Sequence, residues 1–119
     1  MRLKSIRVVL FAIFILFCAV VHARAHAVSL TWTASTDGGV SYTVYRFSGA
    51  CPAAGTIGFS KITATPLTAT TYTDSAVAPG TYCYYATAVL NGAESVPSNL
   101  ASAVILPAAP AALSTTPTN

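Results

Sequence analysis

The stretch PGTYCYYATAVLNG, residues 79–92, decides the fold because it contains the longest strand pattern in the chain. Residues 81–90 are rich in β-branched and aromatic side chains, a composition that favours a strand. Pro79-Gly80 precedes them and Asn91-Gly92 follows, and both dipeptides are typical of tight turns because glycine tolerates a positive φ. The stretch therefore predicts a long β-strand with a turn at each end.

Shorter segments of the same kind recur on both sides of this strand. Turn residues such as Asp37-Gly38-Gly39 separate them, and the side chains within each segment alternate between two faces. No segment after residue 26 shows helical periodicity with caps, so the pattern predicts an all-β sandwich or barrel. The predicted strands are residues 28–33, 41–47, 59–63, 68–73, 81–90 and 100–106.

The first 25 residues have the pattern of a secretory signal peptide. A basic start, Met1 to Arg7, precedes an uncharged apolar run, Val8 to Val21, and small residues follow. We expect cleavage after Ala25 or Ala27 and a secreted or periplasmic protein. The apolar run has 14 residues, whereas a membrane-spanning helix needs about 20. An uncleaved envelope anchor over residues 8–21 is the alternative, and only that alternative predicts a membrane partner.

The charge and residue types of the remaining chain exclude several classes of function. The whole chain carries +3, but from residue 26 onward two basic residues face three acidic ones, which gives −1. This charge argues against nucleic-acid binding. His26 and three scattered acids, Asp37, Asp74 and Glu94, provide neither a catalytic triad nor a metal-ligand cluster. We expect no enzyme, no metal and no cofactor, and we expect each acid to lie in a turn or in solvent.

Four short motifs follow one another in a recognisable order. They are Val28-x-Leu30-x-Trp32, the segment 42–46 (YTVYR), residues 72–74 (YTD) with 80–82 (GTY), and Ser95-x-Pro-Ser-Asn99. Together they resemble a bacterial fibronectin type III module over residues 26–106. The resemblance implies an immunoglobulin-like β-sandwich with interaction or spacing roles and no catalysis. It also implies that the Tyr82 hydroxyl bonds back to the backbone of the preceding turn.

Strand parity and the resemblance together predict which side chains form the core and which face outward. The outward set, Tyr45, Phe47 and Tyr85, has two interpretations. It is either an exposed binding surface suited to stacking on sugar rings, or a small satellite core covered by the loop that contains Cys51. The predicted core residues are Leu30, Trp32, Tyr42, Val44, Tyr82 and Tyr84.

Two cysteines, Cys51 and Cys83, remain once the signal segment is removed. An exported chain meets an oxidising environment, where such pairs form disulfides. Cys83 alternates with Tyr82 and Tyr84 and therefore faces outward, where the loop after the second strand can reach it. We expect a Cys51–Cys83 disulfide.

The chain departs from the resemblance at the start of the domain. Fibronectin type III modules begin with a strand before the tryptophan strand, and here the signal segment ends at that point. Either residues 22–27 form a stub of that strand and the edge is merely short, or the tryptophan strand has an open edge to which a partner can add a strand. Residues 107–119 are rich in Pro, Ala and Thr, and their composition predicts a disordered tail.

These observations favour a non-catalytic module for protein interaction, adhesion or spacing. Two alternatives stay open at this point. One is a carbohydrate-binding module that uses the outward aromatic residues, and the other is a structural protein anchored in the envelope by its first segment. The expected partner is accordingly a protein or a polysaccharide.

Overall fold

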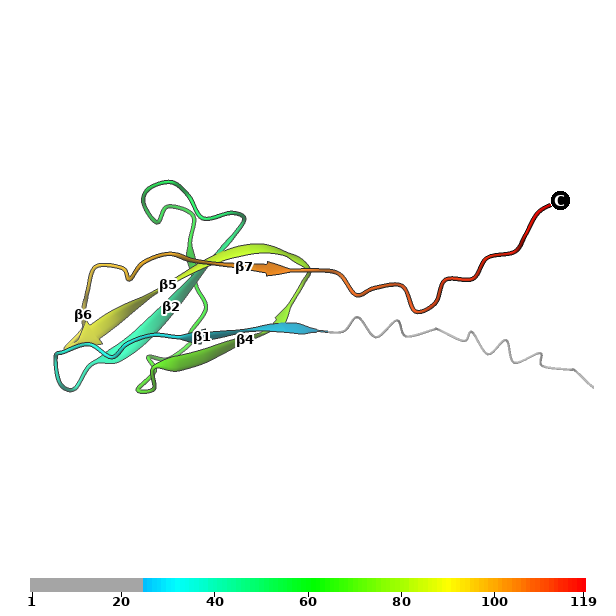
Figure 1. Cartoon of the computed structure of the whole chain (residues 1–119). Coiled ribbons are helices and arrows are strands. Elements are labelled where there is room, and N and C mark those ends of the chain that lie inside the picture. The colour runs from blue at the N-terminus through cyan, green and yellow to red at the C-terminus, as the bar shows by residue number, and fades with distance from the viewer. Residues whose placement is uncertain (1–24) are drawn as a thin grey trace, which may run out of the picture.

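The computed structural model describes residues 25–119, which form two antiparallel sheets (Figure 1). The predicted all-β sandwich is confirmed, with no helix in this part of the chain. The predicted signal segment lies outside the described residues, except for Ala25. The strands are β1 (His26–Thr31), β2 (Ser41–Ser48), β3 (Ser60–Lys61), β4 (Thr71–Val77), β5 (Gly80–Leu90), β6 (Ala93–Glu94) and β7 (Ala101–Ile105).

The long strand β5 is the centre of the larger sheet. It pairs with β2 from Ser48 opposite Tyr82 to Ser41 opposite Val89. Its other edge pairs with β6 near Leu90 and with β7 near Gly80, and β3 extends the sheet beyond β2. The predicted Asn91-Gly92 turn is present, with φ values of 50° and 80°. Two positive φ values are what a two-residue hairpin turn requires.

The smaller sheet consists of β1 and β4, and it contains an irregularity that the sequence did not reveal. Three residues of β1, from His26 to Val28, lie opposite four residues of β4, from Val77 to Asp74. Ala76 takes up the extra residue with a φ of 59°, so β4 carries a bulge. The strand predicted over residues 68–73 in fact runs over Thr71–Val77, because the bulge lets it continue past Asp74.

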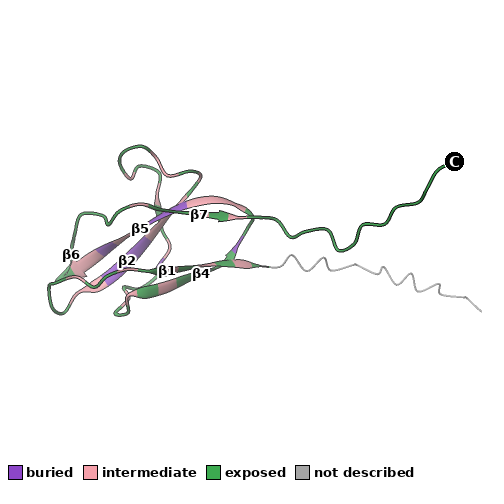
Figure 2. Cartoon of the chain, viewed as in Figure 1, coloured by how far each residue is buried: buried purple, intermediate pink, exposed green. Residues whose placement is uncertain are grey.

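The buried residues lie mainly on the inner and central parts of β2 and β5 (Figure 2). Tyr42, Val44 and Tyr84 are at most 5% exposed, and Val77 of β4 faces them from the smaller sheet at 3%. Residues 107–119 contain no regular element, are exposed throughout and extend away from the sandwich (Figure 1). The core is therefore narrow and depends on few large side chains.

Candidate functional site

One edge of β1 has no strand beside it within residues 25–119, because β1 pairs there with β4 alone. The Trp32 amide donates to the Thr70 carbonyl at 3.0 Å, so alternate residues of β1 point their backbone groups toward β4. The backbone groups of Ala27, Ser29 and Thr31 consequently point to the open edge. No charged side chain or proline lies among residues 27–31 to block that edge.

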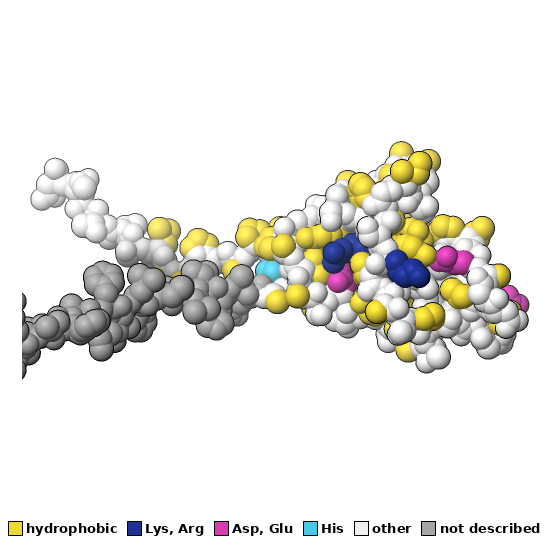
Figure 3. All heavy atoms as spheres, turned by 180° about the vertical axis from the view of Figure 1, so that it is seen from behind, with side chains coloured by type: hydrophobic (Ala, Val, Ile, Leu, Met, Phe, Trp, Pro, Cys, Tyr) yellow, Lys and Arg dark blue, Asp and Glu magenta, His cyan; other side chains and the backbone are white. Residues whose placement is uncertain are grey.

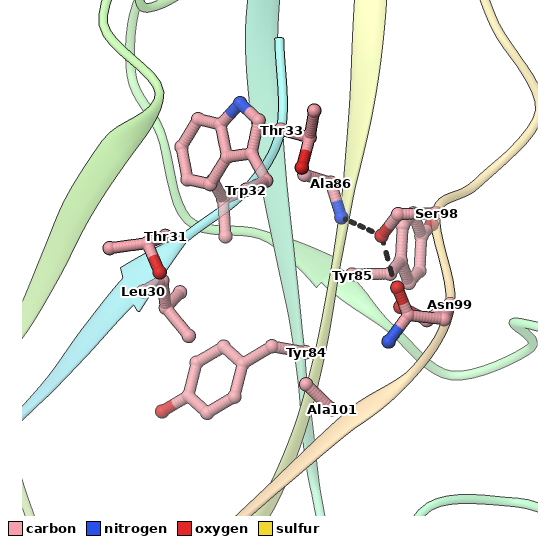
Figure 4. Close-up of a pocket in the computed structure, with 11 residues that line it drawn as sticks. Leu30, Thr31, Trp32, Thr33, Tyr84, Tyr85, Ala86, Ser98, Asn99 and Ala101 are labelled. Carbon is pink, nitrogen blue, oxygen red and sulfur yellow. Dashed lines mark hydrogen bonds between the residues drawn. The ribbon is translucent and has the colours of Figure 1, made fainter.

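A cleft of about 440 Å³ opens beside this edge, between β1 and the chain that leads into β7 (Figure 4). Leu30 and Trp32 line it from the β1 side, and Tyr84 and Ala86 of β5 lie at its inner side. No acidic or basic side chain lines it, so the cleft suits uncharged, partly apolar groups. The other lining residues are Thr31, Thr33, Val44, Tyr85, Ser98, Asn99 and Ala101.

Two serines fix the wall of the cleft opposite β1. The Ala86 amide donates to the Ser98 hydroxyl at 3.0 Å (Figure 4). The Ser98 amide donates to the Ala86 carbonyl at 2.8 Å. Ser95 makes the same pair of bonds with Ala88, at 2.9 and 2.8 Å. Residues 95–98 therefore bond to β5 through side chain and backbone together, although they form no strand. This wall is tied to the central strand, so the cleft is largely preformed.

The cleft explains why the predicted core is only partly buried. Tyr42, Val44 and Tyr84 are buried, but Leu30 and Trp32 are half-buried because no strand of residues 25–119 covers them on the open side. Trp32 packs edge-on against Tyr42 with the ring centroids 5.5 Å apart. Its indole Nε1 is buried and has no hydrogen-bond partner.

Tyr82 is also half-buried, which differs from its predicted place in the core. Its hydroxyl donates to the Ala78 carbonyl at 2.9 Å, so the predicted bond to the preceding turn is confirmed. Its ring lies under the Arg46 guanidinium, with Cζ 5.6 Å from the ring centroid. At this distance the guanidinium and the ring form a cation–π contact.

The three acids do not all lie where the sequence predicted. Asp74 is 6% exposed and lies within β4, where it forms an ion pair with Arg46 at 2.8 Å. The Tyr84 hydroxyl donates to the same carboxylate oxygen at 2.9 Å. Glu94 accepts hydrogen bonds from Tyr45, at 2.7 Å, and from Thr87. The prediction of a turn or solvent position was therefore wrong for Asp74, which joins the two sheets, and incomplete for Glu94, which is exposed but bonded.

The outward aromatic residues form a cluster on the outer face of β2 and β5. Tyr45 and Tyr85 stack with their centroids 4.7 Å apart, and Phe59 lies 4.9 Å from Tyr85 and 5.4 Å from Phe47. All four rings are half-buried. Sequence reasoning placed Phe59 at the start of a predicted strand, residues 59–63, but assigned no face to it, and in the structure Phe59 lies just before β3. The rings therefore pack on one another, as in a satellite core, and they also keep partial contact with solvent, as a binding surface does.

The Cys51–Cys83 disulfide holds the loop after β2 against this face. Cys83 is fully buried, and the predicted bond is present with the Cα atoms 5.0 Å apart. The loop packs tightly on Phe47, since a Cβ at Gly49 would lie 2.8 Å from its Cε1 and one at Gly58 would lie 3.1 Å from its Cε2. The disulfide is also the observation that indicates an oxidising environment for this chain.

Charges on this side of the molecule are mixed. Figure 3 shows the two basic side chains of the described residues, each near an acidic one, with hydrophobic atoms around them.

The hydrogen bond to Glu94 is the main reason why the pKa of Tyr45 is raised to about 12. Burial, followed by the hydrogen bond to Asp74, raises the pKa of the Tyr84 hydroxyl. Both phenols are held in the neutral form.

The raised pKa values predict a loss of stability in alkaline solution. A phenol whose pKa is higher in the folded state stabilises the fold fully below its unfolded value of about 10. That contribution is lost as the pH rises from about 10 through the folded pKa. We expect urea midpoints to be flat between pH 7 and 9 and to fall steeply above pH 10. The urea midpoint of Tyr84→Phe should fall less steeply above pH 10 than that of the unaltered protein. An equally steep fall in the two proteins would contradict the raised pKa of Tyr84.

A comparison of the chain with models of known protein families gives no match, and a comparison with curated protein sequences gives none. Within residues 25–119, no group of three or more His, Cys, Asp or Glu side chains lies close enough together to hold a metal ion. The described part of the chain also has no helix that is long and apolar enough to span a membrane. The open edge of β1 and its cleft are the most developed candidate site.

Proposed function

We propose that this chain is a secreted or periplasmic, non-catalytic module of the fibronectin type III kind that binds protein segments by strand addition. The observation that carries the proposal is the edge of β1 that no strand of the described residues covers, beside a preformed, uncharged cleft. An extended peptide on this edge gains backbone hydrogen bonds from the peptide groups of Ala27, Ser29 and Thr31. Its alternate side chains enter the cleft between Trp32 and Tyr84.

Export is supported by the disulfide and by the pattern of the first segment. The rival proposal is an envelope-anchored structural protein that keeps residues 8–21. Intact mass of the exported protein separates the two. A chain that starts at His26 or Val28 and gains two hydrogens on reduction supports export with cleavage. A chain that retains Met1 supports the anchor.

Strand addition predicts protection of specific backbone amides. We choose as probe a blocked hexapeptide of alternating valine and threonine, which is neutral and extended. At saturating probe, hydrogen exchange should slow at Ala27, Ser29 and Thr31, and not at Val28 or Leu30, whose amides already face β4. The control is the same peptide N-methylated at every residue, which has no N–H donor on either edge and cannot complete a ladder. Equal exchange rates with both peptides would contradict strand addition.

Carbohydrate binding by Tyr45, Phe47 and Tyr85 is a second candidate, supported by the half-exposed cluster that they form with Phe59. Against it, Tyr45 and Tyr85 stack on each other, so each occupies one face that a sugar ring would need. Retention on insoluble cellulose should fall in Tyr45→Ala if the cluster binds sugar. Retention that Tyr45→Ala leaves unchanged would remove these residues from the argument.

A further inference from the structure

The C-terminal arm, residues 107–119, leaves the sandwich at the end where β1 begins (Figure 1). It has no charged side chain, and every residue in it is exposed. Leu113 is 93% exposed, and it is the one large aliphatic side chain in a segment of otherwise small, proline and polar residues. The arm therefore presents one apolar group that the fold of its own copy does not use.

The arm and the open edge of β1 are matched in length and polarity. Residues 111–116 (AALSTT) are six residues without proline, and β1 has six residues. In an extended conformation, Leu113 shares a face with the small residues Ala111 and Thr115. One leucine flanked by small side chains suits an uncharged cleft lined by Leu30 and Trp32. Pro110 and Pro117 bound the segment and limit the ladder to it.

The geometry favours the cleft of another copy over the arm's own. Because β7 ends where β1 begins, an arm that turned back would run parallel to β1. Parallel pairing is slightly less stable per residue than antiparallel pairing. Pro107 and Pro110 also favour an extended chain rather than an immediate reversal. An arm that continues outward meets a second copy and can pair with its β1 in the antiparallel direction.

We propose that residues 111–116 of one copy add as an antiparallel strand to the free edge of β1 in a second copy, with Leu113 in the cleft. This inference rests on the proposed function and names its partner. In each copy β1 begins at the end where that copy's own arm leaves (Figure 1). A strand antiparallel to β1 therefore enters the second copy at the opposite end and runs toward the end from which the second arm leaves. The two copies then have the same orientation, and the arm of the second copy is left to pair with a third. Such a head-to-tail contact cannot close as a two-fold dimer, so it produces a series of oligomers that continues unless the rotation between copies closes a ring.

The assembly is tested by sedimentation of the exported protein over a range of concentrations. The expected result is a concentration-dependent series of dimer, trimer and larger species. A chain that ends at Leu106 should remain monomeric, and Leu113→Asp should weaken association about ten- to a hundredfold, the factor expected for one leucine side chain. The matched control is Leu106→Asp, which places the same charge on an exposed leucine outside the pairing segment. It should assemble as the unaltered protein does.

A mixing experiment makes the two contributions separable. Ser29→Pro removes a backbone donor from the open edge of β1 and leaves the bonds to β4 in place. This variant can still donate its arm to another copy, but its own β1 edge can no longer accept one. Leu113→Asp keeps the cleft and loses the arm. Each variant alone should be monomeric at concentrations where an equimolar mixture forms a dimer and nothing larger. An unshifted melting temperature shows that each variant is folded.

Several results would overturn the inference. These are a monomer at every concentration, a series that survives removal of residues 107–119, or a closed dimer as the sole product. The exchange experiment with the valine–threonine peptide is independent of the arm when it is run on the chain ending at Leu106. Protection there together with a monomeric full chain would overturn the self-assembly and leave the proposed strand addition standing.

Discussion

Replacing Cys51 and Cys83 by alanine is expected to lower the free energy of unfolding by about 3–4 kcal/mol. The disulfide joins residues 32 positions apart, and closing a loop of that length restricts the unfolded chain by this amount in the chain-entropy model. Small domains are stable by only about 5–15 kcal/mol, so the loss is a large share. The expected effect is large because few side chains in this sandwich are fully buried.

Urea unfolding followed by the fluorescence of Trp32 measures this loss, since Trp32 is the single tryptophan of the chain. The unaltered protein with a reductant provides the matched comparison, because it loses the same bond and keeps both side chains. Its midpoint should fall close to that of the double alanine variant. A midpoint that moves in neither case would mean that the loop between Gly49 and Gly58 is held by Phe47 alone.

Local alternation predicted the central strand, the Asn91-Gly92 turn and the disulfide. These features depend on residues that are close in sequence or on the parity of one strand, so a single sequence contains the information. Cys83 could be assigned to the outer face because Tyr82 and Tyr84 flank it. The same parity grouped Tyr45, Phe47 and Tyr85 correctly and omitted Phe59, which reaches the cluster from a loop.

The errors concern interactions between segments that are distant in sequence. Asp74 was expected in a bend because it precedes the Pro79-Gly80 turn. Its partner Arg46 is 28 positions away, and no local pattern reveals that pairing. Leu30 and Trp32 followed the inward parity as predicted, but parity does not say whether a further strand covers them. That open side is the candidate site, so the site arises where the core prediction was incomplete.

Asp74→Ala is expected to cost about 2–4 kcal/mol of the free energy of unfolding. Removing one member of a buried ion pair typically costs about 3–5 kcal/mol, because the partner charge is left uncompensated. Here the Arg46 side chain is 32% exposed, so water compensates part of its charge and the cost is lower. The substitution also leaves the buried Tyr84 hydroxyl without its acceptor. Urea unfolding at pH 7 gives the value.

A double-mutant cycle separates the ion pair from the packing of the two side chains. Asp74→Ala, Arg46→Ala and the double variant are compared with the unaltered protein. Because Arg46→Ala removes the charge that Asp74→Ala leaves uncompensated, the double variant should be more stable than the sum of the single losses predicts, by about 1–2 kcal/mol. Tyr84→Phe is the control for the remaining bond to the carboxylate. It removes one hydroxyl, keeps the ion pair, and should cost about 1–2 kcal/mol. Additive losses from Asp74→Ala and Arg46→Ala would show that the two sheets are held together by apolar packing without a contribution from this pair.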